Sequence, residues 1–342
     1  MCGIAFRGAL RAPAFILCPQ TGWEIDMDKN MKPFVLAIAG PTASGKTWLG
    51  VELAKEYGGE VISADSMQIY KGMDIASAKP TAEEMQGIPH HLISILDRDV
   101  SFSAADYVKL ANEAIEDVLS RGKLPIIVGG TGLYIDSLLN NVQFAEVKSD
   151  PAYREQLYAI SRSEGSERLY AELCEADPAA AESIHMNNTV RVVRALEVIH
   201  VTGRRFSELK EESTSVESPY DSLILGLNAA DRAVLYDRIN MRVDEMVQAG
   251  LIEEARALWE EKSMRTAANA IGYKELIPYF ENEALLSDCI DKIKQETRRY
   301  AKRQLTWFRK NERIRWIIIE DFSKKCEISE KSKKAIANYG RI

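Results

Sequence analysis

The sequence predicts an α/β fold, with a parallel sheet flanked by helices and an all-helical insertion in the middle of the chain. Apolar runs of strand length at 34–39, 59–65, 124–129 and 222–227 alternate with helical patterns, which is typical of parallel sheets. A glycine-bounded loop joins the first run directly to a helix. Between 136 and 205 the alternation stops, and only helical patterns remain.

That loop has the composition and the setting of a phosphate-binding loop. Its backbone N–H groups and the positive N-terminal end of the following helix converge on one small volume. Lys46 adds a mobile positive charge, and Thr47 adds a hydroxyl for Mg²⁺. The pattern predicts a P-loop NTPase-like core, but it leaves open whether the phosphates belong to ATP or to another pyrophosphate. We expect the phosphates to contact Gly40, Thr42, Ala43, Ser44, Gly45, Lys46 and Thr47.

Composition sets the broad class. With 342 residues, 46% of them hydrophobic, the chain can form one large domain or two of ordinary size. The net charge of -7 excludes a uniformly basic surface, so nucleic-acid binding would need a local patch. The five cysteines include no CxxC pair, which favours a reducing cytoplasm over a zinc site or a disulfide framework. No apolar run approaches the roughly 20 residues that a membrane span needs.

Two polar residues follow strands that should end at the edge carrying the loop. Asp65 ends the second apolar run, and Thr131 follows the glycines after the third. Because parallel strands end at the same edge, we expect both side chains to lie near the loop. Asp65 then has three possible roles: a ligand of Mg²⁺ through water, a base or hydrogen-bond acceptor for the modified group, or a helix cap. The adjacent His90 and His91 point to opposite faces of an extended segment, so they make a poor metal pair.

Two segments carry positive charge that suits RNA. Arg191 and Arg194 are neighbours on a helix within the insertion, where phosphate contact and simple solvation are both possible. Residues 292–315 hold ten lysines and arginines but two glutamates, with Tyr300 and Trp307 interleaved. This texture favours nucleic-acid binding over a charged helix whose aromatic residues pack into the core.

These observations divide the chain. We expect a disordered leader at 1–31, because its apolar patch contains Pro13 and lacks a convincing signal-peptide cleavage site. The core domain is expected at 32–136 and 206–320, the helical insertion at 137–205, and a solvated tail at 321–342.

Several segments together resemble the bacterial tRNA dimethylallyltransferases. The resemblance covers about residues 32–315 in family order. It rests on the phosphate-binding loop and on Asp65-Ser66-Met67-Gln68-Ile69-Tyr70, Ala78-Lys79-Pro80, Val128-Gly129-Gly130-Thr131-Gly132-Leu133-Tyr134, Arg194-Ala195-Leu196-Glu197-Val198, Ile271-Gly272-Tyr273-Lys274 and Ala301-Lys302-Arg303-Gln304-Leu305-Thr306-Trp307-Phe308-Arg309.

The resemblance implies transfer of a dimethylallyl group from dimethylallyl diphosphate to N6 of the adenosine beside the 3′ side of the tRNA anticodon. The loop would then bind the diphosphate with Mg²⁺ near Thr47, and Lys46, Asp65 and Thr131 would be catalytic, with Asp65 taking the N6 proton. The implied partner is the anticodon stem-loop, bound by a cytoplasmic monomer. The tRNA contacts carried over are Asp65, Ser66, Met67, Gln68, Thr131, Val190, Arg191, Arg194, Lys302, Arg303, Gln304, Trp307 and Arg309.

Three alternatives remain in competition. An adenylate isopentenyltransferase would share the loop and Asp65 but would not need the insertion or the basic helix. A small-molecule kinase is favoured by the loop alone and would consume ATP. A non-enzymatic, RNA-binding nucleotide switch would leave Asp65 without a chemical task.

Overall fold

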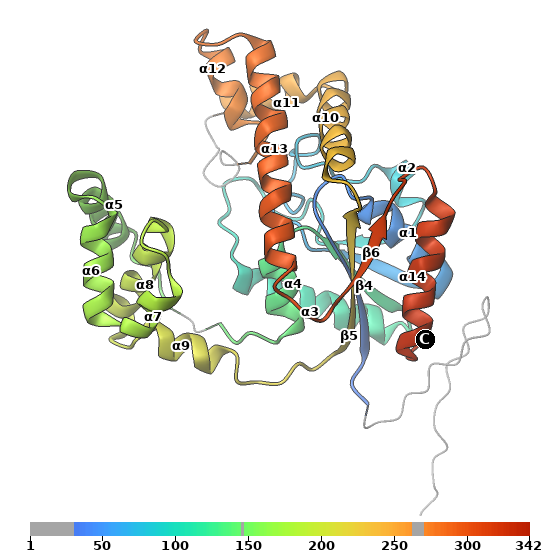
Figure 1. Ribbon diagram of the computed structural model, residues 1–342, viewed down its shortest axis with the longest axis horizontal. Coiled ribbons are helices and arrows are strands. Elements are labelled where there is room, and N and C mark those ends of the chain that lie inside the picture. The colour runs from blue at the N-terminus through green and yellow to red at the C-terminus, as the bar shows by residue number, and fades with distance from the viewer. Residues whose placement is uncertain (1–30, 145–146, 262–269) are drawn as a thin grey trace, which may run out of the picture. The chain divides into compact units, whose positions relative to one another are not determined.

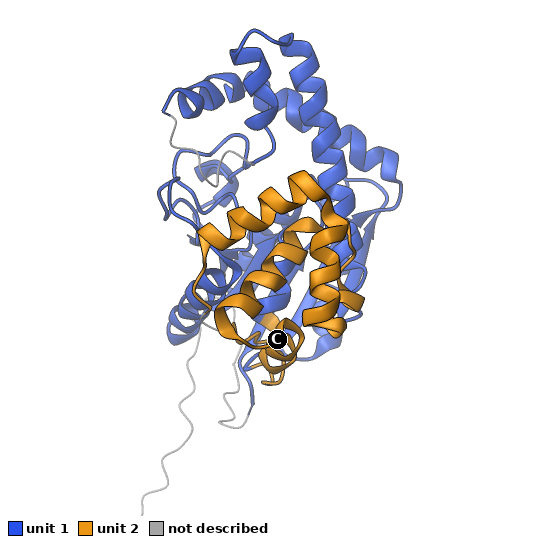
Figure 2. Cartoon of the chain, turned by 90° about the vertical axis from the view of Figure 1, so that its left-hand side faces the viewer, with its two compact units in different colours: residues 1–138, 219–342 blue, residues 139–218 orange. Residues whose placement is uncertain are grey.

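The computed structural model describes residues 31–144, 147–261 and 270–342, which form two compact units. The core unit contains the described residues up to Leu138 and from Pro219 onward, and the helical unit spans Leu139–Ser218 (Figure 2). The leader predicted at 1–31 lies, except for Met31, outside the described residues.

The core unit is built on a parallel sheet, which confirms the predicted fold class. Within the described chain it has six strands in the order β3-β2-β4-β1-β5-β6 (Figure 1). Leu36 pairs with Ile126 and Ile38 with Val128, so apolar side chains of β1 and β4 stand side by side. Both faces of the sheet are covered, which is why its central strands are almost wholly apolar. The strands are β1 (Phe34–Ala39), β2 (Gly59–Ser63), β3 (His90–His91), β4 (Leu124–Gly129), β5 (Asp221–Ala229) and β6 (Ile314–Ile319).

Helices cover this sheet on both sides. Helices α1 (Lys46–Tyr57) and α14 (Lys325–Tyr339) pack side by side against one face (Figure 1). There Leu49 and Leu53 of α1 join Leu36 and Ile38 of β1 in one hydrophobic cluster. The helices of the core unit are α1 (Lys46–Tyr57), α2 (Ala82–Met85), α3 (Ala104–Ser120), α4 (Gly132–Leu139), α10 (Arg232–Gln248), α11 (Leu251–Glu260), the 3₁₀ turn η2 (Lys274–Leu276), α12 (Ile277–Phe280), α13 (Leu286–Phe308) and α14 (Lys325–Tyr339).

Helix α14 corrects the prediction of a solvated tail at 321–342. Ile328, Ser332 and Ile336 recur every four residues and are buried, and both isoleucines join the core of the sheet. The Tyr339 hydroxyl donates to Asp221 Oδ1 at 2.5 Å and closes the helix onto β5. The lysines between these positions gave the segment a polar composition that concealed its amphipathic period.

The helical unit consists of α5 (Pro151–Glu164), α6 (Ser166–Ala176), α7 (Pro178–Ser183), α8 (Thr189–Thr202) and α9 (Phe206–Ser213), so the prediction of helices without a strand is confirmed for its described residues. The unit reaches 218 and therefore extends past the predicted boundary at 205. The cause is Asp177, whose buried carboxylate accepts hydrogen bonds from Ser207 N and Oγ, both at 2.7 Å, and so ties α9 to the insertion.

Candidate active site

The phosphate-binding loop turns tightly between β1 and α1. Gly40 has a φ of +151°, and a Cβ there would lie 2.6 Å from the Leu227 carbonyl oxygen, so only glycine fits. Gly45 precedes α1 in the left-handed region, with a φ of 86°. Lys46 Nζ donates to the Pro41 carbonyl at 2.7 Å, which folds the lysine back over its own loop.

Two partly buried cations, Lys46 and Arg242, lie at this loop. Burial, together with the neighbouring Arg242 of α10, lowers the pKa of Lys46 to about 7, and Asp65 offsets part of that shift. Burial also lowers the pKa of Arg242, although Glu84 and Asp65 act against it. Neither cation has a salt bridge to a carboxylate within the described residues. The loop therefore lies beside two positive charges that the nearby carboxylates balance only in part.

Asp65 and Thr131 lie together, as predicted from the parallel strands. Thr131 Oγ1 accepts a hydrogen bond from Ser66 N at 3.1 Å, which joins the segments that follow β2 and β4. Asp65 Oδ1 accepts from the backbone N–H groups of Met67 at 2.9 Å and Gln68 at 3.4 Å. Within the described residues no donor reaches Asp65 Oδ2. The carboxylate is thus oriented through one oxygen and keeps the other available.

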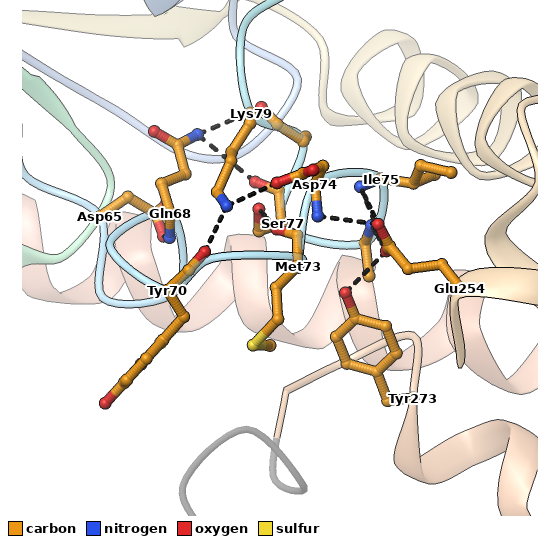
Figure 3. A network of polar contacts seen from close by, with 12 residues as sticks. Asp65, Gln68, Tyr70, Met73, Asp74, Ile75, Ser77, Lys79, Glu254 and Tyr273 are labelled. Atoms are coloured by element: carbon orange, nitrogen blue, oxygen red, sulfur yellow. Dashed lines mark hydrogen bonds and ion pairs between the residues drawn. The ribbon is translucent and has the colours of Figure 1, made fainter. Parts of the chain in front are cut away.

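The loop that follows Asp65 is held by its own polar groups. Gln68 Oε1 accepts from Ser63 Oγ at 3.0 Å, and its Nε2 donates to the Ala78 carbonyl at 3.1 Å. Lys79 Nζ pairs with Asp74 Oδ1 at 2.6 Å and also donates to the Tyr70 carbonyl (Figure 3). The predicted base contact Gln68 is therefore engaged with its own loop.

Glu254 of α11 fixes the same loop from the other side. Its carboxylate accepts the backbone N–H groups of Asp74 at 2.8 Å, Ile75 at 2.9 Å and Ala76 at 3.1 Å, and the Tyr273 hydroxyl at 2.7 Å (Figure 3). Charge-assisted hydrogen bonds of this kind are stronger than neutral ones. The residues after Asp65 are consequently preorganised.

Helix α13 turns two of the predicted tRNA contacts inward. Gln304 Oε1 accepts from Thr42 N at 2.9 Å and its Nε2 donates to the Gly130 carbonyl at 2.9 Å, which links the phosphate-binding loop to the end of β4. Trp307 Nε1 donates to Asp136 Oδ2 at 2.6 Å. The neighbouring Lys302, Arg303 and Arg309 are exposed. The inward face of α13 thus holds the phosphate-binding loop and the end of β4 together, and its outward face presents lysine and arginine side chains to solvent.

Two cavities of the core unit meet at the loop. The larger, of 320 Å³, is lined by Asp65, Ser66, Met67, Tyr300 and many apolar side chains. The smaller, of 300 Å³, is lined by Ser44, Arg238 and Lys325 among others. Lys46, Thr47 and Arg242 line both. An organic diphosphate and a second reactant could therefore approach the same cations from two sides.

Thr47 is the residue of the loop that fits a metal ion. Thr47 lines both cavities, but among the described residues no cluster of three or more His, Cys, Asp or Glu side chains is placed to hold a metal. Mg²⁺ is commonly bound by one or two protein oxygens together with substrate phosphates and water. The residues present fit an ion that arrives with a diphosphate.

The helical unit contains the remaining predicted tRNA contacts. Val190 and Arg191 are exposed at the start of α8. Arg194 Nη1 pairs at 2.8 Å with Glu197 Oε2, whose side chain is fully buried. Arg194 is therefore already anchored by a carboxylate, whereas Arg191 is exposed and forms no ion pair with another residue that the structure describes.

Sequence reasoning missed Arg238 and Arg242. The signal was present, because Arg242 follows Leu235 by seven positions and Ile239 by three, which places it on the inward stripe of α10 at i, i+4 and i+7. A charged residue in such a stripe departs from an amphipathic pattern and indicates a functional position. Glu254 gave no comparable signal, since most of its hydrogen-bond donors are backbone N–H groups of a loop that is distant in the sequence.

Comparisons with known proteins identify relatives of this chain. The family model for IPP transferase matches residues 68–311. A tRNA dimethylallyltransferase of Bacillus subtilis (strain 168) is 51% identical over 290 residues, which cover 84% of this chain and 91% of the relative. One from Thermoanaerobacter sp. (strain X514) is 47% identical over 308 residues, covering 89% of this chain and 96% of the relative.

Solved structures show the same likeness. The full-length tRNA isopentenylpyrophosphate transferase of Bacillus halodurans matches with a TM-score of 0.66 and 45% identity, covering 90% of this chain and 98% of that one. A eukaryotic dimethylallyltransferase acting on tRNA matches with a TM-score of 0.76 and 32% identity, covering 90% of this chain and 79% of that one. In the part of the chain that the structure describes, no helix is long and apolar enough to cross a membrane.

Proposed function

We propose that this chain, which belongs to the IPP transferase family, transfers a dimethylallyl group from dimethylallyl diphosphate to N6 of the adenosine beside the 3′ side of a tRNA anticodon. It is an enzyme of the tRNA dimethylallyltransferase type. One observation carries the proposal: two cavities meet at the partly buried Lys46 and Arg242, and Asp65 lines the larger cavity. Donor and acceptor can thus reach one reaction centre from separate sides.

The donor diphosphate is assigned to the smaller cavity. Backbone N–H groups of the loop, Lys46 and Arg242 supply positive charge there, and Ser44 Oγ is buried without a hydrogen-bond partner among the described residues. Donors fixed in advance stabilise a charge that grows in the transition state, because they need no reorganisation when it forms. When the bond between C1 of the prenyl group and the diphosphate oxygen breaks, Lys46 and Arg242 balance the charge on the departing pyrophosphate.

The acceptor base is assigned to the larger cavity, which has both an apolar lining and Asp65. An adenosine within an anticodon loop must leave its stack to enter such a cavity. Its N6 lone pair forms the new bond to C1 of the prenyl group, and the N6 proton passes to Asp65 Oδ2. The exocyclic amine is a weak nucleophile, so removal of this proton supports the step.

The proposal includes Mg²⁺, which Thr47 would hold beside the phosphate-binding loop. When bound there with the donor, the ion would neutralise part of the diphosphate charge. A tRNA substrate supports a cytoplasmic enzyme.

The exposed face of α13 supports tRNA as the acceptor. Lys302, Arg303 and Arg309 lie on the solvent side of the helix whose other side anchors the active site. Cations in this position can neutralise phosphates of an RNA whose base enters the larger cavity, which Arg303 also lines. We assign the exposed Arg191 of the helical unit to the same task, with Arg194 held by Glu197.

The proposal is tested by incubating the full chain with Mg²⁺, dimethylallyl diphosphate and an unmodified anticodon stem-loop, followed by mass analysis of the RNA. We expect a gain of one prenyl group on the target adenosine without ATP, and none on a stem-loop that carries guanosine at that position. Prenylation of AMP but not of the stem-loop would assign the chain to free-nucleotide chemistry. Phosphoryl transfer from ATP without prenylation would assign it to the kinases.

A further inference from the structure

The smaller cavity has a wall that comes from the C-terminal end of the chain. Phe322, Lys325 and Ile328 line it together with residues of the phosphate-binding loop. Ile328 also belongs to the core of the sheet, so this wall is fixed to the same framework as the loop. The segment 321–342, which has the composition of a solvated tail, is therefore part of the surroundings of the loop.

Phe322 holds an arginine over the loop. Arg238 Nε donates to the Ala43 carbonyl at 3.0 Å, and Arg238 Cζ lies 4.1 Å from the centre of the Phe322 ring. Within the described residues this guanidinium has no other hydrogen-bond partner, and it lines the smaller cavity. One edge and one face of the guanidinium are thus fixed, while its remaining N–H groups are available to an anion.

Lys325 adds a second cation to the same wall. Its Nζ lies 5.5 Å from the centre of the Trp48 ring, which belongs to the first turn of α1 directly after Thr47. The cavity lining then contains four cations, Lys46, Arg238, Arg242 and Lys325, against the two carboxylates Glu84 and Glu245. The buried Ser44 hydroxyl, which no other described residue contacts by a hydrogen bond, lies in the same lining. This combination favours an anion with more than one charge.

We propose that the C-terminal segment 321–342 completes the diphosphate site: Lys325 contacts the diphosphate, and Phe322 is a positioning residue for Arg238. The inference rests on the proposed function, because that function places an organic diphosphate in this cavity. It adds one wall of the site, which the loop and α10 leave open, and it gives α14 a role in the reaction besides covering the sheet.

The test of Lys325 uses a matched pair of variants. Lys325→Gln removes a charge from the cavity wall, and Lys334→Gln removes the same charge from an exposed position of α14 outside the cavity lining. We expect Lys325→Gln to raise the KM for dimethylallyl diphosphate about 10-fold, as for loss of one charge-assisted contact. The KM for tRNA should stay unchanged, and Lys334→Gln should match the wild-type chain. An equal donor KM in both variants would overturn the role of Lys325.

The test of Phe322 separates the ring face from apolar volume. Phe322→Leu should raise the donor KM about 3-fold, as for loss of one cation–π contact, whereas Phe322→Tyr keeps the ring and should retain the wild-type value. A purely structural role would instead give a lowered melting temperature and a lowered kcat with an unchanged donor KM. That result, or equal donor KM values for the leucine and tyrosine variants, would refute the positioning role.

A calorimetric titration keeps this inference separate from the proposed function. Inorganic pyrophosphate with Mg²⁺ should bind the wild-type chain and bind Lys325→Gln about 10-fold more weakly. If the wild-type chain forms no prenylated RNA, the proposed function fails, and this titration still decides whether the wall contacts a diphosphate. If prenylation proceeds but pyrophosphate binds both chains equally, the wall does not belong to the site.

Discussion

The two units each contain a buried charge cluster, and the clusters have opposite balance. In the helical unit, Glu197 is fully buried, yet hydrogen bonds from Arg194 and Arg154 outweigh its burial and lower its pKa to about 2. In the core unit, burial and Arg242 lower the pKa of Lys46 to about 7. The first cluster favours the charged form of its central group, and the second disfavours it.

This difference separates a structural cluster from a binding site. Glu197 also accepts from Ser149 Oγ at 3.1 Å and from Asp150 N at 3.0 Å, so its partners are complete and it fixes the chain that enters α5. Lys46 has one carbonyl partner and faces two cavities. A buried charge with incomplete partners destabilises the empty protein and is relieved when a ligand of opposite charge binds.

The largest expected effect concerns Asp65, because it lies at the cluster around Lys46 and, within the described part of the chain, nothing donates to its Oδ2. Asp65→Asn keeps an acceptor for Met67 N but removes the proton acceptor. We expect kcat to fall about 10²- to 10⁴-fold, the usual contribution of a general base, with the KM for tRNA nearly unchanged. Prenyl-transfer assays over a series of tRNA concentrations would measure kcat and KM, and a melting curve would check that the variant is folded. Equal losses of turnover and tRNA affinity would make Asp65 a binding residue instead.

The next effect concerns the balanced cluster. Glu197→Gln should lower the free energy of unfolding by about 3 kcal/mol at pH 7, because it removes a buried carboxylate that two arginines share. Prenyl transfer by the folded variant should change much less than in Asp65→Asn. Denaturant unfolding with hydrogen exchange in α5 and α8 would locate the loss.

The pH dependence of this loss follows from the pKa of Glu197. The pKa is lowered on folding, so the stabilisation is complete above the unfolded value of about 4.5 and is lost as the pH falls toward the folded value of about 2. The stability difference between the wild-type chain and Glu197→Gln should therefore shrink across that interval. A difference that stayed constant from pH 6 to pH 3 would show that the carboxylate charge is not the stabilising feature.

The parts of the molecule that the sequence predicts are those fixed by local pattern. The loop sequence determines the turn before α1, and the parallel strands bring Asp65 and Thr131 to one edge. Charge composition is less informative, because it does not say which face of a helix is buried. In α13, Gln304 follows the buried Ala301 by three positions and turns inward, while Lys302 and Arg303 between them remain exposed.

Contacts between distant segments account for the rest. Arg238 meets Ala43 and Phe322 across the fold, and neither contact is visible in a local window. Glu254 binds backbone N–H groups, which carry no side-chain signature in the sequence. The unexpected part of the site thus depends on tertiary packing, whereas the predicted part depends on strand order.

Lys302 and Arg303 are exposed, so their replacement shows how much a solvated charge contributes in comparison with the clusters around Lys46 and Glu197. Replacing both with alanine should raise the KM for tRNA about 10-fold and reduce the slope of log affinity against log salt by about two, because each cation releases about one counterion from RNA. The control is Lys324→Ala with Lys334→Ala, which removes the same charge from exposed positions at and near α14. Affinity measured across a salt series would check this, and an unchanged slope would show that the two cations do not face phosphate.

The smallest expected effect is the uptake of a proton by Lys46 when an anion binds. It tests directly whether Lys46 lacks a compensating charge before the anion arrives. With a pKa of about 7, Lys46 is mostly neutral at pH 8 in the empty protein, and contact with a diphosphate favours its charged form. Binding of pyrophosphate at pH 8 should therefore take up at most about 0.9 proton at this group, and nearly none at pH 6, where Lys46 is already charged. Lys46→Arg is the control, because arginine stays charged at both pH values and pyrophosphate's own titration is common to both chains.

Calorimetry in buffers of different ionisation enthalpy measures the proton uptake. The same uptake in both chains at pH 8 would mean that Lys46 is charged before the anion arrives, and the contrast with Glu197 would then reflect burial alone.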